Sequence, residues 1–311
     1  MRTWLLYPLV CAAVFAQEEP TIKVDVDIVN VLCSVRDRRG AFVTNLEKSQ
    51  FTILENGKQQ ELRYFSKESD LPLTIGLLVD VSKSQENLIE IEKHAASQFF
   101  GKVLRNKDMA FLISFGAEAE LLQDLTNSSS LLRKGLDGLR INAPAVGIHP
   151  TTIPQKIRGT ILYDAVYLAA KEKLQREVGR KVIVLITDGM DYGSRLSLDA
   201  ALESAQKSDA IIYSIHYVDP RAYGGMGGYS DSALKRLSED TGGRVFRVDR
   251  RNSLDYIFEQ IQDEMRSQFA LGYVPNTPRD GSFRKVEIRT NQKDLKVQAR
   301  KGYYATPSGS N

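Results

Sequence analysis

The fold of this chain is decided by residues 73–84, which read LTIGLLVDVSKS. The part from Leu73 to Val79 is almost continuously apolar, as is typical of a β-strand that is covered on both faces. A polar segment, DVSKS, follows directly after this strand. In an open parallel sheet, ligands bind beyond the carboxyl ends of the strands. The stretch therefore predicts a central buried strand with a functional loop at its end.

Working outward, strand and helix patterns alternate over residues 71–268. We expect strands at 109–115, 181–186, 210–218 and 244–248, and helices at 86–104, 128–139, 160–174, 198–207, 230–241 and 254–267. In the first helix, apolar residues recur at helical spacing at positions 88, 91, 95, 99 and 103. Such alternation predicts an α/β fold with a doubly wound, mainly parallel sheet and helices on both faces.

The flanking segments, 21–68 and 269–305, carry β patterns instead. Residues 51–58 (FTILENGK) read as a strand that enters an Asn56-Gly57 turn, the strongest short-range hairpin signal. Each flank is too short to build an independent core. We therefore expect the two flanks to pair into one small β-sandwich, with the α/β domain inserted between them.

Residues 1–16 have the features of a signal peptide. Arg2 supplies a positive charge, residues 4–15 are apolar, and Val14 and Ala16 suit the −3 and −1 positions of a cleavage site. The apolar run is shorter than the roughly 20 residues that span a membrane. We expect an exported chain, periplasmic or secreted, with no transmembrane segment after cleavage. The alternative is an uncleaved hydrophobic anchor.

The overall composition argues against a nucleic-acid-binding protein and against a fold held together by disulfide bonds. A formal net charge of +3, with basic residues scattered among acidic ones, leaves no electrostatic footprint for nucleic acid. Cleavage after Ala16 would remove Cys11 and leave Cys33 alone, so the mature chain could form no intrachain disulfide. A hydrophobic fraction of 42% is enough for a packed core without such crosslinks.

The loop after the first strand has the chemistry of a metal site. Alternation in an extended segment puts Asp80, Ser82 and Ser84 on one side. Their oxygens suit a hard cation such as Mg²⁺, and Thr160 and Asp188 can add ligands from two further loops. Because few of these groups are anionic, a bound ion keeps much of its charge. Such an ion would attract a partner's carboxylate.

These residues carry a resemblance. The segments LTIGLLVDVSKS, GTILYDAV and VIVLITDG resemble the metal-ion-dependent adhesion site of von Willebrand factor type A domains. Asp80, Ser82 and Ser84 match the Asp-x-Ser-x-Ser motif of that family, Thr160 its isolated threonine and Asp188 its last aspartate. The resemblance implies Mg²⁺, or Mn²⁺ or Ca²⁺, and reversible binding of a partner protein through a Glu or Asp. The flanking FTILENGK, ALGYVP and RKGYY also resemble the acidobacterial von Willebrand factor A-related family.

Other residues near these loops are expected to touch the partner rather than the metal, namely Lys83, Asp191, Tyr223 and Tyr229. The Pro-rich segment 139–157 and the glycine-rich segment 224–228 have no assigned role. His216 lies in an apolar strand, so we interpret it as a hydrogen-bonded core residue rather than a ligand.

Two alternative functions remain beside metal-dependent protein binding. The chain can be a structural component of an envelope complex whose metal only stabilises the fold. It can also be a metal-dependent hydrolase, but a phosphatase of the haloacid-dehalogenase type needs a second Asp where Ser82 stands. The sequence has no GxSxG motif either. We therefore expect a binding protein and not an enzyme.

Overall fold

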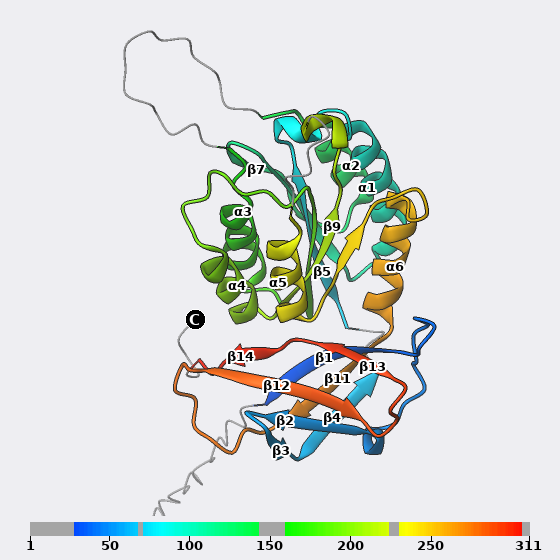
Figure 1. The fold of residues 1–311 in the computed structure, drawn as a ribbon, viewed down its shortest axis with the longest axis vertical. Helices are drawn as coiled ribbons and strands as arrows, with labels where there is room; N and C mark the ends of the chain where they lie inside the picture. Colours follow the sequence, from blue (N-terminus) through cyan, green and yellow to red (C-terminus); the bar gives the residue numbers. More distant parts are fainter. Residues whose placement is uncertain (1–27, 68–70, 143–158, 224–229, 307–311) are drawn as a thin grey trace, which may run out of the picture.

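The computed structural model describes residues 28–67, 71–142, 159–223 and 230–306. It consists of an α/β part stacked on a β-sandwich (Figure 1). The predicted fold class is thereby confirmed. The predicted signal peptide, most of the Pro-rich segment, the glycine-rich segment and Tyr229 lie outside the described residues.

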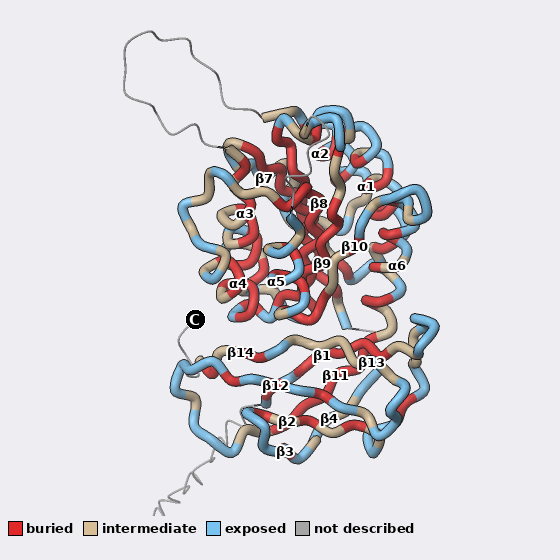
Figure 2. Tube along the Cα trace, in the orientation of Figure 1, coloured by how far each residue is buried: buried red, intermediate tan, exposed pale blue. Residues whose placement is uncertain are grey.

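The α/β part is built on a six-stranded sheet in the order β10–β9–β8–β5–β6–β7. All neighbouring strands are parallel except β6 and β7. Every residue of β5 is buried, because helices cover both faces of the sheet at its centre (Figure 2). The strands are β5 (Leu73–Asp80), β6 (Met109–Phe115), β7 (Ala119–Thr126), β8 (Arg180–Thr187), β9 (Ala210–His216) and β10 (Val245–Arg247).

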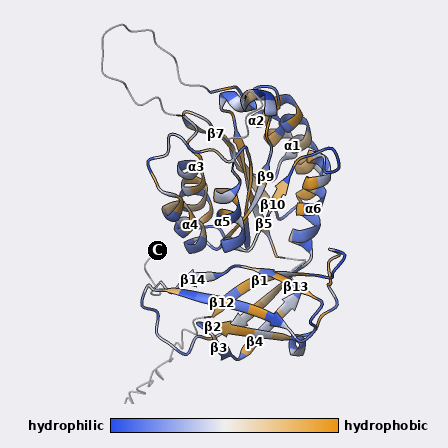
Figure 3. Cartoon of the chain, viewed as in Figure 1, coloured by the Kyte–Doolittle hydropathy of each residue, from blue (hydrophilic) through white to orange (hydrophobic). Residues whose placement is uncertain are grey.

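Two groups of helices enclose this sheet, one on each face (Figure 1). One face carries α1 (Ile89–Val103), α2 (Ser129–Asp137) and α6 (Leu254–Arg266). The other carries α3 (Leu162–Leu168), which continues as a π-helical turn (Ala169–Leu174), α4 (Leu198–Lys207) and α5 (Ser232–Thr241). Their apolar sides face the sheet and their hydrophilic sides face outward (Figure 3). No helix in the described ranges is both long and apolar enough to cross a membrane.

The structure corrects the sequence prediction in two places. Residues 119–126 form an antiparallel edge strand, β7, for which no element was predicted. In α1, Ile91 was expected on the buried face but is 51% exposed, and the buried position beside it is occupied by Glu92. The buried face of α1 is therefore rotated by about one residue relative to the predicted buried face.

The β-sandwich combines both flanks of the chain, in two sheets ordered β13–β1–β11–β4 and β14–β12–β2–β3. Strand β11 from the C-terminal flank lies between β1 and β4 from the N-terminal flank. The N-terminal strands are β1 (Val29–Arg36), β2 (Phe51–Glu55), β3 (Lys58–Gln60) and β4 (Leu62–Lys67), and the C-terminal strands are β11 (Gln268–Tyr273), β12 (Phe283–Thr290), β13 (Lys296–Ala299) and β14 (Gly302–Tyr304). Each of the two four-stranded sheets therefore takes strands from both flanks.

A buried ionic cluster joins the sandwich to the α/β part. Glu264, near the end of α6, is fully buried and forms ion pairs with Arg36 of β1 and with Arg244, whose Nε lies 2.9 Å from the carboxylate. The hydroxyl of Ser34 donates a hydrogen bond of 3.1 Å to the same carboxylate. Because partners from both parts of the chain neutralise one buried charge, the cluster fixes how the two parts sit together.

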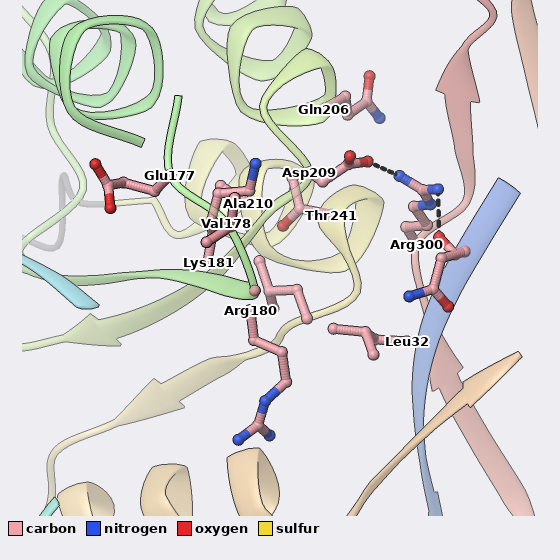
Figure 4. Close-up of a pocket in the computed structure, with 13 residues that line it drawn as sticks. Leu32, Glu177, Val178, Arg180, Lys181, Gln206, Asp209, Ala210, Thr241 and Arg300 are labelled. Atoms are coloured by element: carbon pink, nitrogen blue, oxygen red, sulfur yellow. Dashed lines mark hydrogen bonds and ion pairs between the residues drawn. The ribbon is translucent and has the colours of Figure 1, made fainter. Parts of the chain in front are cut away.

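A second, more open connection lies at the seam between the two parts. Arg300 forms an ion pair with Asp209 of the α/β part and donates to the carbonyl of Asn30 in β1 (Figure 4). These residues border a cavity of about 300 Å³ at the end of the sheet where β8 and β9 begin. The carboxyl ends of the strands, where the predicted site lies, are at the opposite end (Figure 1).

Substituting Glu264→Ala should destabilise the protein by about 3–5 kcal/mol, because Arg36 and Arg244 would be left as uncompensated, partly buried charges. Urea unfolding followed by circular dichroism measures this loss. The matched control is Glu259→Ala on the same helix, whose side chain is 54% exposed and pairs with Lys102. That exposed pair should contribute less than about 1 kcal/mol. Equal losses in the two variants would contradict the role assigned to the cluster.

Candidate metal centre

The site lies at the carboxyl ends of two adjacent parallel strands, β5 and β8. Asp80 is the last residue of β5, and Asp188 directly follows the end of β8. The chain leaves β5 for β6 on one side and returns to β8 on the other. This is a point where the strand order reverses, so the two following loops diverge and leave room for a ligand.

Asp80 is held rigidly at the base of the site. Its side chain is fully buried. One carboxylate oxygen, Oδ1, accepts a hydrogen bond of 2.9 Å from the backbone N–H of Ser82. The other, Oδ2, accepts one of 2.6 Å from the hydroxyl of Thr187 at the end of β8. The first and second loops are thus linked through one carboxylate.

A chain of short polar contacts leads from Ser82 to Asp188. The hydroxyl oxygens of Ser82 and Ser84 lie 3.0 Å apart. The hydroxyl of Ser84 donates to Oδ2 of Asp188 at 2.5 Å. On the far side, the ring Nε2 of His216 lies 3.1 Å from the backbone carbonyl of Asp188. His216 therefore supports the second loop from the core, as its place in an apolar strand indicated.

Thr160 reaches the site from a third loop, which is held on both sides. Its carbonyl accepts hydrogen bonds of 3.0 Å from the N–H groups of Tyr192 and Gly193, and the N–H of Ile161 donates to the carbonyl of Gly116 at 3.0 Å. The two loops approach so closely that a Cβ on Gly193 would lie 2.5 Å from the carbonyl oxygen of Gly159. Only glycine fits at this crossing.

The three loops enclose a common space. Ser82, Ser84 and Thr160 line one cavity of about 230 Å³. Asp80 and Asp188 join it through their hydrogen bonds to Ser82 and Ser84. The structure thus brings all five predicted site residues together.

The residues predicted to contact a partner are placed differently from one another. Lys83 is exposed and pairs with Glu86, and it borders the cavity. Tyr223 also borders it, and its hydroxyl donates to Oδ2 of Asp188 at 2.6 Å. The carboxylate of Asp191, by contrast, accepts hydrogen bonds from the hydroxyl of Ser194 in its own loop and, at 3.3 Å, from the backbone N–H of Tyr163 in α3.

The electrostatics of the site favour a cation. Burial, and then the nearby charge of Asp188, raise the pKa of Asp80 to about 7, although hydrogen bonds from Thr187 and Ser82 act in the opposite direction. Two carboxylates are therefore held close together where water is excluded. Together with three hydroxyl oxygens they form an all-oxygen donor set, which suits Mg²⁺, Mn²⁺ or Ca²⁺. Asp80, Ser82, Ser84, Thr160 and Asp188 are the residues able to hold such an ion.

Two residues that affect the charge of the candidate metal site, Thr187 and Glu92, were not predicted from the sequence. Thr187 bonds Asp80 because β5 and β8 pair in a register that places Thr187 beside it. Glu92 of α1 is fully buried, and neither of its carboxyl oxygens has a hydrogen-bond partner in the described part of the chain. Burial, and then the charges of Asp80 and Asp188, hold the pKa of Glu92 well above its usual range. In the sequence, the position of Glu92 on the apolar side of the predicted helix was the one sign that this carboxyl would be buried.

Comparison with known proteins identifies the class of this domain. Residues 75–190 match the family model of the von Willebrand factor type A domain. This part of the chain is therefore a von Willebrand factor type A domain, which confirms the predicted family; the metal-binding role of the five site residues stays a prediction. The more specific resemblance to the acidobacterial family remains a prediction.

Individual relatives are distant. An uncharacterized protein of Borreliella burgdorferi is 21% identical over 224 residues, which cover 69% of this chain and 59% of that protein. Two solved structures of proximal thread matrix protein 1 from the mussel byssus share 16% identity with this chain. The match to the structure with a zinc-occupied MIDAS motif has a TM-score of 0.50 and covers 67% of this chain and 48% of the mussel chain. The other has a TM-score of 0.51, with 68% and 51% covered. This chain thus spans about half to three fifths of these proteins, and the structural likeness shows a shared fold.

The buried carboxyl of Glu92 predicts an unusual pH dependence of stability in the presence of chelator. Because its pKa is raised in the folded state, the folded protein keeps a proton that the unfolded chain loses above about pH 4.5. Stability should therefore fall as the pH rises from 5 to 7, by up to about 1.4 kcal/mol per pH unit for this group. The Glu92→Gln variant should show a shallower slope in urea melts at pH 5, 6 and 7.

The pKa of Asp80 is also raised in the folded state. Titration of Asp80 should therefore leave part of the pH dependence of stability in the Glu92→Gln variant. Glu90→Gln serves as the control, because Glu90 is on the same helix but its side chain is 80% exposed. The interpretation fails if Glu92→Gln and Glu90→Gln keep the slope of the unsubstituted protein.

Proposed function

We propose that this chain is an exported protein-binding module that uses a divalent cation, held by Asp80, Ser82, Ser84, Thr160 and Asp188, to bind a carboxylate of a partner protein. The observation that carries this proposal is the convergence of three separate loops on one cavity. A helix cap or a structural turn would need only one of these loops.

The charge balance of the donor set favours binding an acidic partner. Only Asp80 and Asp188 are anionic among the five residues. Both carboxylates also accept hydrogen bonds, from Thr187 and Ser84, which draw electron density away from the metal. Mg²⁺ requires six ligands in near-octahedral geometry, so five protein donors leave at least one position. A Glu or Asp of a partner is the ligand that such a position prefers.

The arrangement of the hydroxyls supports binding rather than catalysis. The hydroxyl of Ser84 donates a hydrogen bond to the carboxylate of Asp188, and the ring Nε2 of His216 lies 3.1 Å from the backbone carbonyl of Asp188. A bound cation would take up both Ser84 and Asp188, so this pair would not be left to act as a nucleophile and its base. The zinc-occupied MIDAS motif of the mussel byssus protein supports a divalent ion at this position of the fold. Residues 1–16 support export to the periplasm or the exterior, where the partner would be met.

Calorimetry on the chain from residue 17 onward tests the metal site. The unsubstituted protein should bind one Mg²⁺ or Mn²⁺, and Asp80→Asn and Ser84→Ala should each weaken binding at least tenfold, because each removes a donor. Asp263→Asn, at an exposed position of α6, is the control and should bind normally. Absence of metal binding in the unsubstituted protein, or normal binding by Asp80→Asn, would contradict the proposal.

A partner captured from an envelope extract separates this function from a purely structural metal. With Mg²⁺ present, the unsubstituted protein should retain the partner and Asp80→Asn should not. Chelator should release the partner while the circular dichroism spectrum stays unchanged. Loss of the folded spectrum together with the partner would instead favour a metal that only stabilises the fold.

A further inference from the structure

Tyr223 brings a fourth segment of the chain to the metal loops. It is the last residue of a short 3-10 turn, η4 (Pro220–Tyr223), which packs beside the turn of the first loop, η2 (Lys83–Gln85) (Figure 1). Its hydroxyl donates a hydrogen bond of 2.6 Å to Oδ2 of Asp188. The same oxygen accepts a hydrogen bond of 2.5 Å from the hydroxyl of Ser84. The phenol is thus hydrogen-bonded directly to one of the five site residues.

Tyr223 is also close to the space that a partner's carboxylate would have to occupy. It borders the cavity that Ser82, Ser84 and Thr160 line. A carboxylate approaching an ion held by these residues must pass through this cavity. A carboxylate lacks a proton to donate to Asp188, so it cannot replace the hydrogen bond that the phenol makes.

The turn that carries Tyr223 is fastened at its beginning. The carboxylate of Asp219 accepts hydrogen bonds from the side-chain amide of Asn87 at 2.7 Å and from the N–H of Arg221 at 3.0 Å. Asn87 lies in the segment between the first metal loop and α1. The start of η4 is therefore anchored to the first loop, and Tyr223 at its end is held over the second.

We propose that Tyr223 is an internal competitor for the site, and that its phenol must leave Asp188 before a partner's carboxylate can bind the metal. This inference rests on the proposed function, because it concerns access to the same cation. The phenol is a neutral hydrogen-bond donor at physiological pH, because the ordinary pKa of a tyrosine is about 10. The protein alternates between a closed site, with the phenol on Asp188, and an open one.

The size of the effect follows from the hydrogen bond that must break. A carboxylate binds only the open fraction of the protein, so its apparent affinity is reduced by that fraction. A hydrogen bond to a charged group has a net strength that corresponds to a change of about tenfold or more in an equilibrium constant. Removing the hydroxyl should raise the apparent affinity for a carboxylate by about tenfold.

The experiment uses the protein loaded with Mn²⁺ and acetate as the probe. Water-proton relaxation reports the bound Mn²⁺, and its decrease on titration with acetate reports the displacement of metal-bound water. Tyr223→Phe removes one oxygen atom and keeps the ring. Tyr192→Phe is the matched control, because Tyr192 borders the same cavity but is 61% exposed. We expect about tenfold tighter acetate binding for Tyr223→Phe and no change for Tyr192→Phe.

A second measurement follows the phenol itself. In protein labelled at the tyrosine ζ-carbons and loaded with Mg²⁺, the resonance that is missing in Tyr223→Phe should shift when acetate is added. Equal or weaker acetate binding by Tyr223→Phe, with Mn²⁺ still bound, would overturn the competitor role and leave the proposed function intact. Failure of all variants and of the unsubstituted protein to bind Mn²⁺ would overturn both.

Discussion

Two carboxylates held together away from water are the constraint on which the rest of this site depends. Asp80 and Asp188 follow neighbouring parallel strands, and the pairing of β5 with β8 fixes their separation. Their mutual repulsion is reduced by donors from several segments, namely Thr187, the Ser82 backbone, Ser84 and Tyr223. A divalent cation would satisfy both charges at once, whereas each hydrogen bond satisfies only part of one. The loops are therefore arranged around a charge that the protein alone leaves incompletely balanced.

The sequence was sufficient for the parts of the fold whose signal is local. The apolar run 73–79 and the alternation of strands and helices predicted the sheet and both helical layers. Alternation also placed Asp80, Ser82 and Ser84 on one side. Thr160 and Asp188 depended on the resemblance to a known family, since nothing local shows that loops eighty to one hundred residues further along the chain meet the first.

The features that the sequence did not predict depend on tertiary context. Strand β7 is half-exposed along its length and lacks the clean alternation of a strand with one buried face. In α1, ranking residues by hydrophobicity favoured Ile91 over Glu92, whereas the structure buries the carboxyl and exposes the aliphatic chain. The bond from Thr187 to Asp80 requires the register of two strands that are separated by about one hundred residues. A register of that kind cannot be read from either strand alone.

The interleaving of β11 between β1 and β4 also imposes an order of events on synthesis. Strand β4 ends at Lys67, and β11 begins at Gln268. At ordinary translation rates of about 5–20 residues per second, the N-terminal strands wait roughly 10–40 seconds for the strand that belongs between them. During this interval the edges of β1 and β4 that will pair with β11 are open to other chains. A chain of this topology therefore needs protection of its first strands until the last ones have emerged.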